Sequence, residues 1–274
     1  MSISDGTVTG LGEAAPGNLT GADTAQLCQT QIEAFLDACP EALDSPHDGW
    51  RLAREQGLAS CAWAAVDIAL WDLLAKRAHQ PLFRLLGLPR RAVATSVTVG
   101  ILPPDVVRER VPEILSRTGA RYLKVKLGSP EGLDADRAMY AAVVEAAADF
   151  EVVVRVDANG GWDLDAARQM IDWLKDRGCD YVEQPLHFNA DDQLPELFSR
   201  RSLPIFVDES CHVSADVPRL AGAVDGVNLK LMKCGGITEA LRIVAAARAH
   251  DLQTMIGCMG ESSVAIGAGA SIGA

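Results

Sequence analysis

Five short apolar segments, each ending in charged residues, dominate the middle of this 274-residue chain. They cover residues 122–128, 152–159, 181–185, 205–210 and 226–231. Between consecutive segments lie amphipathic stretches long enough for a helix, so the sequence predicts a strand–helix unit that repeats. The carboxyl ends of successive parallel strands meet on one face of a barrel, where barrel enzymes hold their active sites. We therefore expect the charged strand ends to share one face.

The predicted barrel has seven strands. Two further strands are expected at residues 95–100 and 253–258, and a helix is expected after each charged strand end. A closed barrel of this class has eight parallel strands. The sequence therefore predicts an α/β fold, a (β/α) barrel domain over residues 92–274 that is shortened at its C-terminal end and lacks the eighth strand.

Residues 1–91 have a different pattern. Apolar positions at helical spacing predict helices at 21–39 and 58–78, and the second is apolar enough to be largely buried. The glycine-rich stretch at 1–17 reads as a strand end and a loop, and we expect no complete hairpin before Gly10. The sequence thus predicts a small α-rich N-terminal domain over residues 1–91.

Composition excludes some classes of partner. The formal charge is −12 and 23% of residues are charged, which argues against non-specific binding to nucleic acid and against an anionic membrane surface. The seven cysteines are scattered singly without a CxxC pair, which indicates reduced thiols. There is no secretory signal and no apolar run of membrane-spanning length. We expect a cytoplasmic enzyme that acts on a small molecule and forms a homo-oligomer.

Three carboxylates end consecutive strands of the predicted barrel, one strand–helix unit apart: Asp157, Glu183 and Asp208. Hard divalent cations such as Mg²⁺ take oxygen ligands and need few carboxylates. Converging carboxylates without a cation would repel and raise one another's pKa. Any one of them alone is better explained as a helix cap or a local ion pair. The three in register favour a metal site.

Lysines accompany these carboxylates. Lys124 and Lys126 are two residues apart on one strand, so both side chains point to the same side, into the barrel. Two neighbouring ammonium groups are expected to lower at least one lysine pKa toward the range useful for a general base. Lys230 ends a later strand, and a second ammonium there could return a proton that the first removes. Lys233 is the competing candidate, but we expect it in the loop beyond that strand.

Polar residues lie next to the predicted ligands: Asn159, Gln184 and Glu209. Such groups can orient metal ligands through hydrogen bonds. An ordinary turn residue is an equally good interpretation of each. Both interpretations stay open on sequence alone.

Several motifs together resemble the enolase superfamily, in its muconate-lactonising branch, and most of all its alanine–glutamate dipeptide epimerases. The resemblance covers nearly the whole chain. It lies in residues 10–16, 65–73, 123–127, 156–162, 183–186, 208–210, 228–236 and 257–259. Each motif is modest alone, but their order and spacing are specific for the superfamily. The resemblance implies a barrel of the modified TIM type with a small N-terminal capping domain.

The resemblance also implies roles for named residues. Asp157, Glu183 and Asp208 would bind Mg²⁺, which would stabilise an enolate formed next to the substrate carboxylate. Lys126 and Lys230 would be the acid–base pair of a 1,1-proton transfer, and Lys124 would lower the pKa of Lys126. From the Gly-Cys-Met motif, Cys258 and Met259 would contact the substrate.

Two departures from the family pattern concern the ends of the chain. The family's Asp-x-Asp on the eighth strand, which binds the dipeptide ammonium group, is not reached, and the first strand of the capping hairpin is not evident. We therefore expect the capping domain to be shortened. Three functions stay open: a Mg²⁺-dependent dipeptide epimerase; a cycloisomerase or an o-succinylbenzoate-synthase-like dehydratase using the same site; and a catalytically silent barrel with an interaction role.

Overall fold

The computed structural model describes residues 1–90 and 94–273. The chain divides into two compact units. One comprises 1–93, 211–218 and 228–274, and the other comprises 94–210 and 219–227. The predicted boundary between residues 91 and 92 falls outside the described residues, so it stays a prediction.

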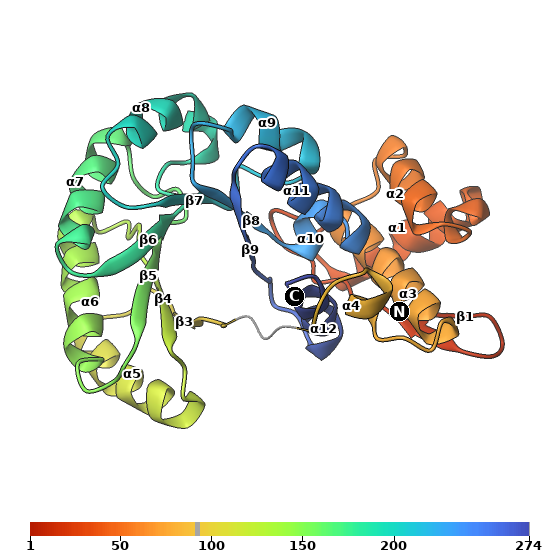
Figure 1. Ribbon diagram of the computed structural model, residues 1–274, viewed down its shortest axis with the longest axis horizontal. Coiled ribbons are helices and arrows are strands. Elements are labelled where there is room, and N and C mark those ends of the chain that lie inside the picture. Colours follow the sequence, from red (N-terminus) through yellow and green to blue (C-terminus); the bar gives the residue numbers. More distant parts are fainter. Residues whose placement is uncertain (91–93, 274) are drawn as a thin grey trace. The chain divides into compact units, whose positions relative to one another are not determined.

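The second unit is built from alternating strands and helices, as the repeated sequence pattern predicts. Its elements are β3 (Val97–Val99), α5 (Pro104–Thr118), β4 (Tyr122–Lys126), α6 (Leu133–Ala146), β5 (Val153–Asp157), α7 (Leu164–Lys175), β6 (Cys179–Glu183), the 3₁₀ helix η2 (Phe188–Gln193), α8 (Leu194–Ser199) and β7 (Ile205–Val207). Helices α5 to α8 line one side of these strands (Figure 1).

The remaining barrel-region elements carry the chain into the first unit. They are the 3₁₀ helix η3 (Ser214–Asp216), α9 (Val217–Leu220), β8 (Gly226–Leu229), α10 (Leu231–Cys234), α11 (Ile237–Ala249), β9 (Gln253–Ile256) and α12 (Ser263–Ile272). Within the described ranges, β3 to β9 form a seven-stranded sheet in sequence order. Neighbours from β3 to β8 pair in parallel. The α/β class and the seven strands are confirmed.

Alternation along each strand sorts its side chains onto two faces. In β4, Leu123 and Val125 are fully buried, whereas Lys124 and Lys126 point to the other side and keep part of their surface. The buried positions of β5 and β6, which include Val156 and Val182, follow the same rule. The apolar residues therefore occupy the helix-covered face, and the charged ones are left for the inner face.

The N-terminal part of the first unit is organised around one long helix, α3 (Ser60–Arg77). Its other elements are β1 (Ser2–Ser4), β2 (Thr9–Leu11), α1 (Ala25–Ala38), the 3₁₀ helix η1 (Pro40–Leu43), α2 (Pro46–Glu55) and α4 (Leu82–Leu85). Phe35, Trp63, Val66 and Leu70 form the centre of its apolar core. The helices predicted at 21–39 and 58–78 correspond to α1 and α3, whereas α2 and α4 were not predicted.

The expectation of no complete hairpin before Gly10 is wrong. Residues Ser2–Ser4 pair antiparallel with Thr9–Leu11, so a two-stranded hairpin opens the chain. Gly10 and Gly12 let this segment lie against α3, because a Cβ on either would come within 2.0 Å of a carbonyl oxygen of that helix. The glycines that suggested a loop are needed for this close approach.

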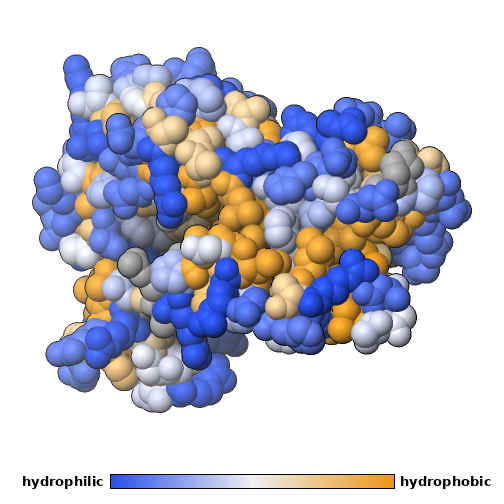
Figure 2. All heavy atoms as spheres, turned by 45° about the vertical axis from the view of Figure 1, so that its right-hand side comes forward, coloured by the Kyte–Doolittle hydropathy of each residue, from blue (hydrophilic) through white to orange (hydrophobic). Residues whose placement is uncertain are grey.

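Hydrophilic and hydrophobic side chains both reach the surface (Figure 2). Figure 2 shows hydrophilic side chains spread over much of one face, in keeping with the formal charge of −12. No helix in the described ranges is both long and apolar enough to cross a membrane.

Candidate active site

Three of the predicted site residues face one another across adjacent strands. Lys126 is paired with Asp157, and Asp157 with Glu183, so the ends of β4, β5 and β6 are aligned. Asp208 directly follows β7, which neighbours β6. Aligned parallel strands bring their carboxyl ends to one edge of the sheet, and the second unit gathers these charged residues there.

Lysine and carboxylate groups alternate in space at this edge. Lys124 Nζ lies 2.8 Å from Asp157 Oδ2 and 2.7 Å from Glu183 Oε2. Lys126 Nζ lies 2.6 Å from the same Asp157 oxygen. Both carboxylate side chains are fully buried, whereas Lys126 keeps 26% of its side chain exposed. The side chain of Lys124 is 16% exposed, so Lys126 is the more accessible of the two lysines.

The electrostatics of the site follow from burial and from these contacts. Burial alone lowers the pKa of Lys124, but the Glu183 and Asp157 carboxylates outweigh it and raise that pKa above its usual range. Burial likewise works to raise the pKa of Asp157, yet the two ammonium groups hold it below its ordinary value. The pKa of Lys124 is therefore raised, whereas two neighbouring ammonium groups alone would lower a lysine pKa, because its ammonium contacts two carboxylates.

Glu183 shows that the carboxylates interact. Burial, together with the negative charges of Asp157 and Asp208, raises the pKa of Glu183 to about 7, although Lys124 opposes the shift. Asp157 and Asp208 thus act on Glu183 in the same direction, and a cation bound among the three carboxylates would counter that repulsion.

The donor set suits a hard divalent cation in its chemistry, because all three groups offer carboxylate oxygens. Asp157, Glu183 and Asp208 are each fully buried at the ends of neighbouring strands. Across the described residues, no three His, Cys, Asp or Glu side chains already stand in a metal-holding cluster. Lys124 draws two of the carboxylates toward its own ammonium. The three carboxylates are suitable ligands for Mg²⁺, and their oxygens must move closer together to bind one ion.

Gln184 fixes the segment that carries Asp208. Its Oε1 accepts hydrogen bonds from the Asp208 N–H at 2.8 Å and from the Ser210 N–H at 3.3 Å. Its Nε2 donates to Leu186 O and to Ser210 Oγ, both at 2.8 Å. The side chain is fully buried and its backbone has a φ of 39°. Gln184 is thus a turn residue and also holds the Asp208 segment in place.

Asn159 and Glu209 contact each other beside the carboxylates. Asn159 Nδ2 donates to Glu209 Oε1 at 3.2 Å, and the Asn159 N–H donates to Asp157 Oδ1 at 2.9 Å. Asn159 also has a φ of 46°, a left-handed conformation that L-residues adopt rarely and asparagine more readily than most. Asn159 thus lies in a turn and contacts both Asp157 and Glu209, and its role in orienting a metal ligand stays a prediction.

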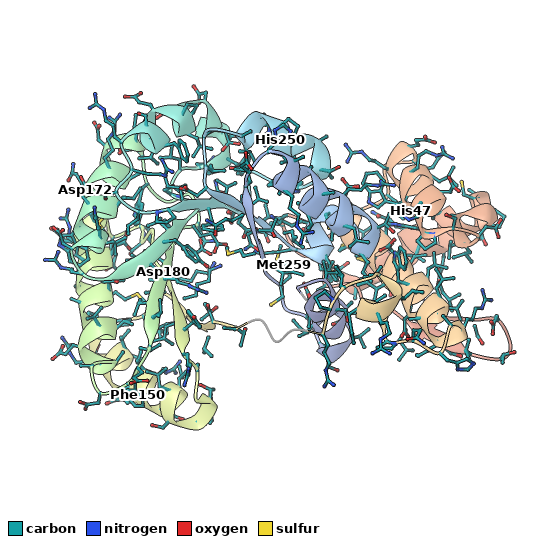
Figure 3. All side chains as sticks on the ribbon, in the orientation of Figure 1. His47, Phe150, Asp172, Asp180, His250 and Met259 are labelled. Carbon is teal, nitrogen blue, oxygen red and sulfur yellow. The ribbon has the colours of Figure 1, made fainter. Side chains whose placement is uncertain are left out.

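Arg155 adds a cationic layer to the same face of the sheet. It is paired with Lys124 across β4 and β5. Its guanidinium lies 4.1 Å from the centre of the Tyr122 ring and donates to Asp180 at 2.9 Å. Figure 3 labels Asp180 on β6. Nothing in the sequence pattern singled out Arg155, because it lies in mid-strand.

Lys230 belongs to the first unit, where it follows β8 and precedes α10. Its residue is 8% exposed. A Cβ on Gly257 would lie 3.1 Å from Lys230 Cε and 2.7 Å from Asn228 Oδ1. The absence of a side chain at Gly257 therefore leaves room for the lysine stem beside the end of β9.

Cys258 and Met259 follow β9 in the same unit (Figure 3 labels Met259). Cys258 is exposed and Met259 is half-buried. The Met259 N–H donates to Glu261 Oε1 at 2.8 Å. Burial, aided by Glu13, raises the pKa of Glu261, while the Met259 N–H and the Lys230 charge oppose the shift. Sequence reasoning missed this carboxylate near Lys230, since no strand-end pattern marks it.

The expectation that Lys233 lies in a loop is wrong. It lies in the short helix α10, and its residue is only 2% exposed. Its Nζ donates to Cys211 O at 2.9 Å and to Asn228 O at 3.1 Å. The buried ammonium ties two backbone segments of the first unit together, which an exposed loop lysine would not do.

Comparison with known families agrees with this geometry. Residues 106–274 match the enolase C-terminal domain-like family. Residues 1–87 match the N-terminal domain of mandelate racemase and muconate lactonizing enzyme. The two matches together span most of the chain.

Similar proteins include epimerases. The chain is 62% identical over 275 residues to a hydrophobic dipeptide epimerase of Roseobacter litoralis, covering 100% of this chain and 79% of that protein. A hydrophobic dipeptide epimerase of Flavobacteria bacterium is 54% identical, with 96% of this chain and 75% of that protein covered.

Among solved structures, the dipeptide epimerase of Enterococcus faecalis complexed with Mg and the dipeptide L-Leu-L-Tyr is similar throughout. Its TM-score is 0.89 at 34% identity, covering 98% of this chain and 76% of that one. This likeness bears out the modified TIM barrel with an N-terminal domain. The chain therefore belongs to the enolase superfamily and is an isomerase of its mandelate racemase and muconate-lactonizing branch.

Proposed function

We propose that this chain is a Mg²⁺-dependent epimerase of dipeptides, which inverts the carbon next to the substrate carboxylate. The observation that carries the proposal is the aligned triplet of Lys126, Asp157 and Glu183, which puts a partly exposed ammonium beside two buried carboxylates. The 62% identity to an epimerase over the whole of this chain supports it.

We infer hydrophobic dipeptides as the substrate class. The relatives at 62% and 54% identity are both named hydrophobic dipeptide epimerases. The similar Enterococcus faecalis structure holds L-Leu-L-Tyr. The sequence motifs alone favoured alanine–glutamate dipeptides, so L-Ala-L-Glu is the substrate to compare against.

The two lysines would share the proton transfer. A proton next to a carboxylate is far less acidic than any side chain, so its removal requires positive charge that stabilises the growing negative charge. In the proposal one of Lys126 and Lys230 removes the proton, and the other returns one to the same carbon. Lys124, held by two carboxylates, would stay charged and add to the positive field.

Asp157, Glu183 and Asp208 would hold Mg²⁺, which when bound supplies positive charge to the substrate carboxylate. Gln184 would keep the Asp208 segment in place through its hydrogen bonds to Asp208 and Ser210. Magnesium in the related Enterococcus faecalis and Methylococcus capsulatus structures supports this metal.

Proton NMR in D₂O with MgCl₂ tests the proposal. L-Leu-L-Tyr and L-Ala-L-Glu are incubated separately with the enzyme, and the α-proton signal is followed together with the appearance of the epimer. The proposal predicts exchange and epimer formation, faster with L-Leu-L-Tyr. Exchange that is faster with L-Ala-L-Glu would correct the substrate class. Turnover of a cycloisomerase or dehydratase substrate, without exchange of any dipeptide, would replace the epimerase assignment.

A further inference from the structure

Asp136 is a buried carboxylate that joins two loops of the second unit. It lies in the first turn of α6 and its residue is 2% exposed. Its Oδ2 accepts from the Gly128 N–H at 3.1 Å and from Trp162 Nε1 at 2.9 Å. Its Oδ1 accepts from the Ser129 N–H at 2.9 Å. One side chain thus satisfies two donors after β4 and one donor after β5.

These two loops begin at predicted site residues. Lys126 ends β4 two residues before Gly128, and Asp157 ends β5 five residues before Trp162. The Leu127 N–H donates to Asp157 O at 2.8 Å, so the two strand ends are tied directly. Any shift of either loop would move the lysine relative to the carboxylate that it contacts.

The loops pack without side chains between them. A Cβ on Gly128 would lie 2.2 Å from Ala158 O, and a Cβ on Gly161 would lie 2.6 Å from Gly128 Cα. Gly128 also has a φ of 81°, which favours glycine. The backbones after β4 and β5 are therefore in direct contact, and Asp136 holds this contact from the α6 side.

The connection continues to β6. The Gly160 N–H donates to Gln184 O at 2.7 Å, and the Trp162 N–H donates to Pro185 O at 3.2 Å. Trp162 is 4% exposed, so its indole is fixed between the Asp136 carboxylate and the surrounding chain. Asp136 thus stands at one end of a series of contacts that links the segments after β4, β5 and β6.

Only a carboxylate matches this set of donors. Three N–H groups point at two oxygens, and an ionised aspartate accepts on both. Asparagine replaces one oxygen with an NH₂ group, which cannot accept and would face an N–H donor. Leaving a buried donor without an acceptor is costly, so the loops would move to relieve it.

We propose that Asp136 is a positioning residue of the reaction: it holds the loops after β4 and β5 so that Lys126 keeps its place beside Asp157. This inference rests on the proposed function. A displacement of about 1 Å in a reacting group lowers rates by about a hundredfold. Removal of the Asp136 acceptor should therefore reduce kcat far more than it weakens substrate binding.

The test compares three variants with the wild type, all assayed below their unfolding temperatures. Asp136→Asn removes one acceptor oxygen, and Trp162→Phe removes the indole donor together with part of the buried ring. Ile171→Ala opens a cavity in α7, at a residue that is 1% exposed and whose apolar side chain donates no hydrogen bond to Asp136. The measurements are Tm, kcat and KM for α-proton exchange, and hydrogen exchange at the Gly128 and Ser129 amides.

For Asp136→Asn we predict a kcat lower by about a hundredfold, a KM within about threefold of wild type, and faster exchange at Gly128 and Ser129. Trp162→Phe should show the same pattern with a smaller loss of kcat. Ile171→Ala should lower Tm and leave kcat within about twofold. A kcat within twofold of wild type in Asp136→Asn, or in Trp162→Phe if the first variant does not fold, overturns the proposal.

If the wild-type enzyme is inactive, the proposed function is wrong, and the result says nothing against the positioning role of Asp136. The amide measurement separates the two, since it needs no substrate. Selectively faster exchange at Gly128 and Ser129 in Asp136→Asn would uphold the positioning role for a different reaction. Unchanged exchange at both amides would overturn it.

Discussion

Lys126 and Asp157 are paired across β4 and β5, and the Lys126 ammonium lies 2.6 Å from Asp157 Oδ2. The carboxylate is fully buried, whereas the lysine keeps part of its side chain exposed. An accessible ammonium is thus held in place by a buried carboxylate. In the proposed reaction Asp157 would bind Mg²⁺, and Lys126 would remove or return the substrate proton.

Replacing any predicted magnesium ligand should weaken the binding of Mg²⁺. Asp157→Asn, Glu183→Gln and Asp208→Asn each remove one of the anionic oxygens on which the predicted site depends. We expect Mg²⁺ affinity, measured by isothermal titration calorimetry, to fall at least about tenfold in each variant. Asp165→Asn is the control, because the Asp165 side chain is 85% exposed on α7. Wild-type affinity in all three ligand variants would contradict the assignment.

Asp67 should make stability depend on pH. It is fully buried in α3 and accepts hydrogen bonds from the Thr238 N–H and hydroxyl at the start of α11. Burial raises its pKa from 3.8 to about 7 in spite of these bonds. The folded state therefore keeps a proton that the unfolded chain releases above about pH 4. The free energy of unfolding should then fall as pH rises from about 4 to about 7, by up to about 4 kcal/mol.

Urea unfolding at several pH values between 4 and 8 measures this effect. Asp67→Asn removes this titrating group and should reduce the slope of the profile between pH 4 and 7, and the slope that remains comes from Glu183, whose pKa burial also raises to about 7. Asp134→Asn serves as the control, because the Asp134 side chain is 98% exposed. The explanation fails if Asp67→Asn retains the wild-type slope between pH 4 and 7.

Gly12→Ala should destabilise the first unit. A Cβ at this position would lie 1.8 Å from Ala65 O, so the segment must move away from α3. Overpacking of this kind costs about 1–3 kcal/mol, which urea unfolding would detect. Gly17→Ala is the matched control, because a Cβ there meets nothing within 4 Å. Equal stability of the two variants would show that the close approach is not needed.

The strand-end pattern predicted much of the fold and of the candidate site because β4, β5 and β6 are regular. Leu123 and Val125 alternate with Lys124 and Lys126, and the same period puts Asp157 and Glu183 on the same face. Spacing between successive strand ends then aligns them. These features depend on the alternation of residues within a strand and on the spacing between strands, and both can be recognised in the sequence alone.

Other features depend on contacts between distant residues. The hairpin was missed because each of its strands has only three residues, and its pairing reads as a loop. The sequence favours a loop for Lys233 because its acceptors, Cys211 O and Asn228 O, come from other segments. Asp136 resembles the exposed Asp134 in the same turn, and only the tertiary fold makes one of them an acceptor for two loops.

The most direct test of the account follows proton exchange in single-lysine variants. Lys126→Ala and Lys230→Ala are each incubated in D₂O with MgCl₂ and either epimer of a dipeptide that the wild type turns over, with Lys175→Ala as an exposed-lysine control. If the two lysines share the transfer, neither variant interconverts the epimers, and any exchange that remains affects only one epimer in each. Epimerisation at the wild-type rate in either variant would contradict the two-lysine mechanism.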